Sequence, residues 1–282
     1  PSPRPMDEAT GASQILDGGD HPAPPTSISQ PWWRVRTEAE GVEGLSIFEE
    51  FDDAEFGAKG GGEVGAMVGK GPLGAGARWL RPAECLDPEA MLFANAEPFV
   101  FRRSSALDAS GFLAALAAVS TQAALVLKLF VSVEYCNQGA YTLRFYAGGA
   151  WTDVLVDTSL PCDDAGTPLC TTALPATSYG VPLLEKGYAK LLGGYSRLAH
   201  ASVEDALVAL TGGSVAREVF EDRDIASRVA TGDLVRELRA ALSAGSISLL
   251  QAGARRKQQL ELRGRSLHGL RTGEPYVLLG FA

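Results

Sequence analysis

The pattern of hydrophobic and polar positions separates a polar N-terminal stretch from an organised remainder. Residues 1–44 are rich in Pro, Ser, Gly and acidic residues and show no sustained hydrophobic period, which predicts an irregular tail or linker. The stretch 57–77 is rich in glycine and predicts a flexible loop inserted into the ordered chain. It does not fit the phosphate-loop pattern G-x-x-x-x-G-K-[ST], because Val64 and Gly71 stand at two of its required positions.

Four later segments carry the apolar spacing of helices. They cover residues 107–127, 182–192, 202–210 and 234–244. In the third, Ser202 and Asp205 form a capping pattern, and the pair Gly212-Gly213 follows its end.

Strand patterns begin with residues 139–157, where apolar positions flank Gly148-Gly149 and predict a β-hairpin. Shorter extended segments are expected at 78–86, 246–250, 258–262 and 276–281. Helices dominate the first part and strands the last, which predicts an α+β fold with a boundary near Gly213.

The stretch 111–133 is apolar enough to raise the question of a membrane span. Ser120, Thr121, Gln122 and Lys128 interrupt it. A buried core helix followed by a strand is therefore the favoured interpretation, and no membrane span is expected.

Composition and charge are those of an ordinary globular protein, with 46% hydrophobic and 21% charged residues. The formal net charge of −9 argues against nucleic acid as a partner. A basic cluster near the C-terminus is expected to be a solvated face rather than a phosphate site. It consists of Arg255, Arg256, Lys257, Arg263 and Arg265.

The four cysteines are Cys85, Cys136, Cys162 and Cys170. They show neither C-x-x-C spacing nor histidine partners at metal-binding spacing. Cys162 and Cys170 flank a turn and could lie close together, but reduced thiols in an intracellular protein are expected.

The segment D-A-S-G-F-L-A-A-L-A carries the main candidate chemistry, because Ser110 opens the long apolar helix. Either Asp108 or Ser110 could cap that helix with its side-chain oxygen. Trp79 and Trp151 are expected to pack in the core or on the hairpin. Asp163, with the following Asp and Gly, is expected to form a turn.

Several segments, in order, resemble the calpain family of papain-like cysteine proteases. FEEFDDAEFGA, RWLRPAE and ALDASGFLAALAAV resemble its opening segment, its W-x-R-P-x-E segment and its nucleophile helix L-G-D-C-W-[LF]-L-A-A-L. YTLRFYAGGAWTDVLVDTSLP resembles its hairpin. LLEKGYAKLLGGYSRL with EDALVALTGG is the most specific match, and LRAALSAGSISLLQA and GLRTGEPYVLLG resemble the second subdomain.

This resemblance covers roughly residues 45–282 and implies a papain-like protease core. The expected organisation is a tail at 1–44, a helical first subdomain at 45–212 and the start of a β-rich second subdomain at 213–282. That second subdomain is expected to be incomplete. The glycine-rich stretch would be an insertion in the first subdomain.

The resemblance also locates the catalytic positions. The FLAALA register places Ser110 at the cysteine nucleophile, with Gly111 in place of the following Trp. Ser104 falls on the Gln that would supply an oxyanion donor, and Glu274 falls on the His. A serine hydroxyl is far less acidic than a thiol, and a carboxylate is a poor proton acceptor for it.

The family's calcium site is a further point of comparison. Glu185 matches one calcium ligand by position, but the acidic partner falls on Phe101, followed by Arg102 and Arg103. Two cations oppose a divalent metal. We therefore expect no metal and no cofactor, with Glu185 paired to one of the arginines.

Because three catalytic positions differ together, the resemblance implies an inactive calpain-like pseudoprotease rather than an enzyme. Its expected role is a protein-interaction or scaffold module in a larger protein or assembly. The expected location is intracellular, in the cytoplasm or cytoskeleton, including the cilium or flagellum. Two alternatives stay open: a calpain-like intracellular hydrolase with a nonstandard nucleophile, and a calcium-responsive regulatory module.

Overall fold

A computed structural model describes parts of the chain. These are residues 49–57, 78–93, 101–102, 109–132, 138–174, 177–218, 223–251, 266–267, 270–271 and 275–280. The predicted tail, most of the glycine-rich stretch, the predicted strand at 258–262 and the basic cluster lie outside these residues.

A three-stranded antiparallel sheet forms one side of the fold, in the order β3-β4-β5. It consists of β3 (Phe130–Ser132), β4 (Ala140–Ala147) and β5 (Ala150–Asp157). Gly148 and Gly149 join the last two strands with φ values of 60° and 87°. Two left-handed residues in a row suit the twist of a two-residue hairpin, so the predicted hairpin is confirmed.

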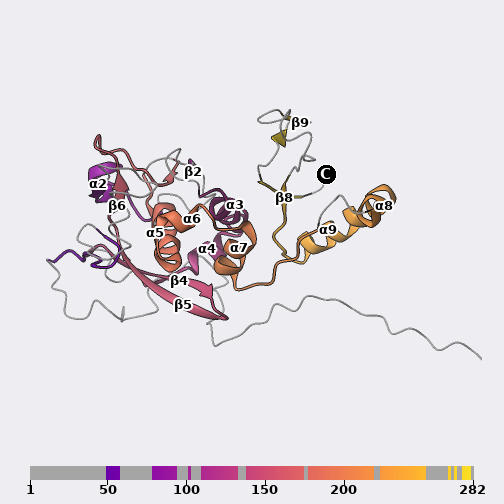
Figure 1. Cartoon of the computed structure of the whole chain (residues 1–282), viewed down its shortest axis with the longest axis horizontal. Coiled ribbons are helices and arrows are strands. Elements are labelled where there is room, and N and C mark those ends of the chain that lie inside the picture. Colours follow the sequence, from indigo (N-terminus) through magenta and orange to yellow (C-terminus); the bar gives the residue numbers. More distant parts are fainter. Residues whose placement is uncertain are drawn as a thin grey trace, which may run out of the picture.

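Helices pack together against this sheet (Figure 1). They are α3 (Ser110–Val119), α4 (Ala123–Leu127), α5 (Gly180–Leu192), α6 (Tyr195–Leu198) and α7 (Val203–Thr211). Their common core includes Phe112, whose ring stacks on Tyr188 with centroids 4.8 Å apart, and Leu143 and Phe145 of β4. Burial of such apolar side chains is the main source of stability for the fold.

The single helix predicted at 107–127 is wrong, because two helices form there. The hydroxyl of Ser120 donates to the Ala117 carbonyl at 2.7 Å, and that of Thr121 donates to the Ala118 carbonyl at 2.7 Å. Side-chain hydrogen bonds of this kind compete with the helical ladder. The chain turns at these polar residues, and α4 starts only at Ala123.

The prediction for α7 is confirmed in its details. The Ser202 hydroxyl accepts a hydrogen bond from the Asp205 backbone N–H at 3.0 Å. The helix ends at Gly212, which has a φ of 67°. A side-chain cap at the start and a left-handed glycine at the end are what the sequence pattern predicts.

Two short strand pairs extend the fold away from the hairpin. β1 (Arg78–Leu80) pairs with β6 (Leu160–Cys162), and β2 (Phe101–Arg102) pairs with β7 (Thr172–Ala173). Residues 78–86 are only half extended, because Pro82–Cys85 forms the short helix α2. Proline fits the first turn of a helix, where its missing N–H has no intrahelical acceptor. The predicted turn at Asp163 is confirmed, since its carboxylate accepts from the Thr167 N–H at 2.8 Å.

The last part of the chain carries two helices and short strands. They are α8 (Arg223–Thr231), α9 (Asp233–Ser243), β8 (Leu249–Gln251), β9 (Ser266–Leu267), β10 (Leu270–Arg271) and β11 (Pro275–Val277). α9 confirms the predicted helix at 234–244, whereas α8 was not predicted. The strands expected at 246–250 and 276–281 are shorter, with β8 pairing antiparallel to β11.

Mixed helices and strands agree with the predicted α+β class. Within the described ranges, no helix has both the length and the apolar character needed to cross a membrane. The apolar stretch at 111–133 instead contributes buried side chains such as Leu113 and Leu116 of α3 and Phe130 of β3.

Candidate active site and the buried ionic network

Ser110 is the first residue of α3, and its side chain is only partly buried. Ala109 is the N-cap residue, and its methyl side chain has no oxygen with which to cap the helix. The prediction that Ser110 caps the helix is therefore wrong, because its backbone is already helical. Asp108, the other predicted cap, lies outside the described residues.

The first turn of α3 packs closely against the start of α7. A Cβ on Gly111 would lie 2.1 Å from the carbonyl oxygen of Ala201. No real side chain tolerates that separation from a backbone atom. Glycine at this position therefore sets how closely the Ser110 end of α3 approaches the chain before Ser202.

A strand from the far end of the chain lies against the same helix. β11 begins at Pro275, immediately after Glu274, and contacts α3. Glu274 and Ser104, which the resemblance aligns with the catalytic His and the oxyanion Gln, lie outside the described residues. The fold therefore brings the segment that follows Glu274 to the helix that begins at Ser110.

Glu185 lies fully buried in α5 and not in an ion pair with Arg102. Its Oε2 accepts a hydrogen bond from the Thr171 backbone N–H at 2.9 Å. Burial raises the pKa of Glu185 to about 7, although hydrogen bonding from Thr171 opposes the shift. Arg102 is exposed on β2, and the Glu185 carboxyl is bonded to the Thr171 amide and not paired with this arginine, so that half of the predicted pairing is wrong. Arg103 lies outside the described residues.

Within the parts of the chain that the structure describes, no three His, Cys, Asp or Glu side chains are arranged to hold a metal ion. Glu185 Oε2 has a backbone amide as its partner, whereas the buried Oε1 has no hydrogen-bond partner among the described residues.

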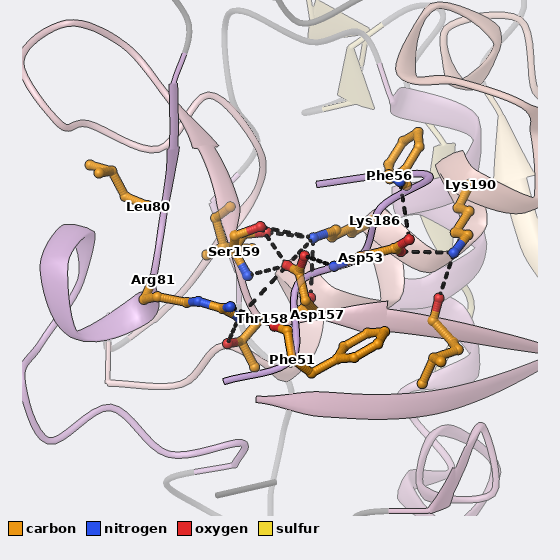
Figure 2. Close-up of polar contacts among 12 residues, drawn as sticks. Phe51, Asp53, Phe56, Leu80, Arg81, Asp157, Thr158, Ser159, Lys186 and Lys190 are labelled. Atoms are coloured by element: carbon orange, nitrogen blue, oxygen red, sulfur yellow. Dashed lines mark hydrogen bonds and ion pairs between the residues drawn. The ribbon is translucent and has the colours of Figure 1, made fainter. Parts of the chain in front are cut away.

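The next residue of α5, Lys186, is the centre of a buried ionic network (Figure 2). Its side chain is 0% exposed, and its Nζ lies 2.6 Å from Asp157 Oδ1, which is also 0% exposed. The ammonium also donates to the Ser159 carbonyl at 2.8 Å and lies 4.6 Å from the centroid of the Trp79 ring. Carboxylate, carbonyl and aromatic groups of the protein thus surround this cation.

The Asp157 carboxylate is satisfied just as fully. It accepts from the backbone N–H of Asp53 at 2.8 Å and of Ser159 at 2.7 Å, and from the Ser159 hydroxyl. Burial alone would raise the pKa of Asp157, but the charge and hydrogen bond of Lys186 and these donors lower it below its ordinary value. Burial lowers the pKa of Lys186, and Asp157 opposes that shift.

Two further cations attach the segment before β1 to this network. Lys190 Nζ lies 2.7 Å from Asp53 Oδ2 and 2.8 Å from the Leu155 carbonyl. Arg81 donates to the Phe51 carbonyl at 2.6 Å and to the Thr158 hydroxyl at 2.9 Å (Figure 2). Charged groups therefore join three parts of the chain that are distant in sequence: the segment around Asp53, the end of β5 and α5.

Sequence reasoning missed this network, although a signal was present. In L-L-E-K-G-Y-A-K-L-L, apolar residues occupy most positions around Glu185 and Lys186, apart from Lys190. A helix that is apolar all round is buried, and buried charges must be paired. The partners Asp157 and Asp53 could not be found from local spacing.

Comparison with known proteins places the chain in a family. Residues 51–282 match the family described as calpain family cysteine protease. The chain therefore belongs to the calpain family.

Individual relatives agree with this assignment. The chain is 35% identical over 144 residues to calpain-type cysteine protease ADL1 of Oryza sativa subsp. japonica, covering 48% of this chain and 6% of the relative. It is 33% identical over 144 residues to calpain-13 of Rattus norvegicus, covering 49% and 21%. It is 34% identical over 151 residues to calpain-10 of Mus musculus, covering 51% and 22%. The match thus spans a small part of each relative's length.

These comparisons correct one prediction from the sequence. The chain was predicted not to be an enzyme, on the basis of the residues at three aligned positions. Its relatives are named calpain-type cysteine proteases or calpains, which points to protease activity. The prediction of a non-enzyme is therefore wrong. The chain belongs to a family of proteases, although three aligned positions carry different residues.

Proposed function

We propose that this chain is a calpain-type protease domain in which Ser110 occupies the position of the attacking residue. The observation that carries the proposal is the place of Ser110 at the first turn of the buried helix α3, in the register that FLAALA shares with the family's nucleophile helix. The partly exposed side chain and the helix N-terminus suit an attacking group whose charge increases during the reaction.

The chemistry follows the papain-like scheme with an oxygen nucleophile. The Ser110 hydroxyl attacks the carbonyl carbon of a peptide bond while a base takes its proton. The base returns this proton to the leaving nitrogen as the C–N bond breaks, and an acyl-enzyme ester remains. Water then hydrolyses the ester. Glu274, aligned with the family's His, is the proposed proton acceptor; a carboxylate is a weak base near neutral pH, so the rate is expected to be low.

The domain organisation belongs to the same proposal. We expect residues 45–212 and 213–282 to act as two subdomains, with peptide bound between them. Support comes from β11, which follows Glu274 and lies against α3. The oxyanion donor is not supplied by Gln at position 104, so backbone N–H groups at the start of α3 take that role in this scheme.

A second function, protein interaction within a larger protein, rests on α8 and α9. Val229 is 50% exposed and Val235 is 41% exposed on these helices. Exposed apolar side chains are enriched at contact surfaces. An intracellular location, cytoskeletal or ciliary, stays a prediction.

A covalent probe tests the catalytic proposal. The purified chain is incubated with a serine-reactive fluorophosphonate, digested, and the modified peptide is mapped by mass spectrometry. We expect one adduct, on Ser110, which is lost in Ser110→Ala and kept in Ser120→Ala, a serine at the other end of the same helix. An adduct on a different residue, or none on the folded protein, would contradict the proposal.

A further inference from the structure

Two thiols from separate elements lie at one point of the strand pair β1–β6. Leu80 of β1 is directly opposite Leu160 of β6 in the antiparallel ladder. Cys85 Sγ, at the end of α2, lies 3.9 Å from the Leu80 carbonyl oxygen. Cys162 Sγ lies 3.5 Å from the Leu160 carbonyl oxygen. Both sulfurs are therefore directed at the backbone of the same paired position.

The two thiols differ in exposure. Cys85 is partly exposed, whereas Cys162 is 0% exposed. An oxidant dissolved in water can therefore reach Cys85 before Cys162. Cys170 is also buried, at 1% exposure, so it is a third thiol that an experiment must separate from this pair.

The electrostatics of the pair agree with this difference. A hydrogen bond from the Cys162 thiol lowers the pKa of Cys85, although burial and the charge of Glu84 oppose the shift. The same hydrogen bond to Cys85 and burial raise the pKa of Cys162, as do the charges of Cys170 and Asp163. Cys85 therefore loses its proton more readily than Cys162, which keeps its proton and donates it in the hydrogen bond.

We propose that Cys85 and Cys162 are a peroxide-sensitive pair that forms a reversible disulfide between α2 and β6. The Cys85 thiolate attacks one oxygen of hydrogen peroxide, the O–O bond breaks, and the leaving hydroxide takes a proton to become water. Cys85 becomes a sulfenic acid. The Cys162 sulfur then attacks the Cys85 sulfur and displaces hydroxide, which takes the Cys162 proton and leaves as a second water. A dithiol reductant reverses the step by thiol–disulfide exchange.

The bond would tie the part of the fold that holds the ionic network. Arg81 lies between β1 and α2 and bonds to Phe51 and Thr158. A cross-link from Cys85 to Cys162 fixes this segment to β6 and restricts the unfolded chain. The oxidised protein should therefore melt at a higher temperature than the reduced one.

The test treats the folded full chain with stoichiometric hydrogen peroxide, blocks remaining thiols with iodoacetamide, and maps cross-linked peptides without reduction. We expect a peptide pair joining Cys85 to Cys162, with the mass of two hydrogens lost, and its disappearance after dithiothreitol. Cys85→Ser, at the partly exposed position, should abolish the pair, whereas Cys170→Ser should retain it.

Labelling gives a second readout that does not depend on a buried substitution. In the reduced wild-type protein, iodoacetamide should modify Cys85 faster than Cys162 or Cys170. Peroxide treatment should then protect Cys85 from the reagent. A link from Cys162 to Cys170, a link only between two molecules, or Cys85 that stays reactive after peroxide would overturn the proposal.

Discussion

Replacing Lys186 by Met tests the role of the buried network most sharply. Met fills much of the same volume but removes the ammonium that lies 2.6 Å from Asp157. The carboxylate would keep its donors from Asp53 and Ser159. It would have no buried counter-charge, because Arg81 lies at 3.8 Å and is only partly buried.

The expected cost follows from this geometry. Both members of the pair are 0% exposed, and breaking a buried pair by removing one partner costs about 3–5 kcal/mol. Arg81 and the remaining hydrogen bonds keep part of the carboxylate's stabilisation, so we expect a loss of about 3 kcal/mol in the free energy of unfolding.

Urea denaturation, followed by circular dichroism, measures this free energy. Lys190→Met is the matched control, because its ammonium also binds a carboxylate but its side chain is 16% exposed, so that water can partly replace it; it should lose less stability than Lys186→Met. Adding Asp157→Asn to Lys186→Met should restore part of the loss, since no charge is then left unpaired. A Lys186→Met variant as stable as Lys190→Met would refute the reasoning.

Two further predictions concern packing and pH. Gly111→Ala should destabilise the fold by about 2 kcal/mol, because a Cβ 2.1 Å from the Ala201 oxygen outweighs the ~1 kcal/mol by which helices favour Ala. Thermal melting beside Gly213→Ala, where the nearest atom would be 3.2 Å away, checks this, and equal melting points would contradict it. The Glu185 carboxyl has a pKa of about 7 in the fold against an ordinary 4.5, so the fold binds more protons than the unfolded chain between these values. Its stability contribution is therefore lost as pH rises through that window, by up to about 3 kcal/mol at pH 8. Glu185→Gln should become more stable relative to wild type between pH 5 and pH 8 in urea titrations, and a pH-independent difference would exclude this cause.

Elements defined by local chemistry were predictable from the sequence. Gly148-Gly149 between alternating apolar residues predicted the hairpin, and Ser202 with Gly212 predicted both ends of α7. In each case the residues that fix the backbone lie next to one another in the chain.

Features that depend on distant partners were not predictable. The end of α3 at Ser120 and Thr121 was not predicted, because the strongly apolar run around these two hydroxyl residues favours a single continuous helix. The pairing of Lys186 with Asp157 joins a helix to the end of a strand, and no local spacing announces it. The arginine pairing expected for Glu185 placed a charge partner where the fold supplies a backbone amide.

The start of α3 was predicted in position but not in its surroundings. The FLAALA run correctly placed Ser110 at the start of a buried helix. The Ala109 cap and the close approach of Ala201 to Gly111 depend on how α3 packs against α7. Judging activity from three aligned residues alone led to the non-enzyme prediction that the family comparison overturns.

The most direct test of the proposed function is turnover of peptide bonds by the purified chain. Cleavage of an unfolded fluorescent polypeptide is followed for the wild type, Ser110→Ala and Ser110→Cys. We predict slow cleavage by the wild type, background for Ser110→Ala, and a rate about tenfold higher or more for Ser110→Cys, because a thiol ionises far more readily than a hydroxyl. Cleavage that persists in Ser110→Ala, or its absence in both the wild type and Ser110→Cys, would contradict the account.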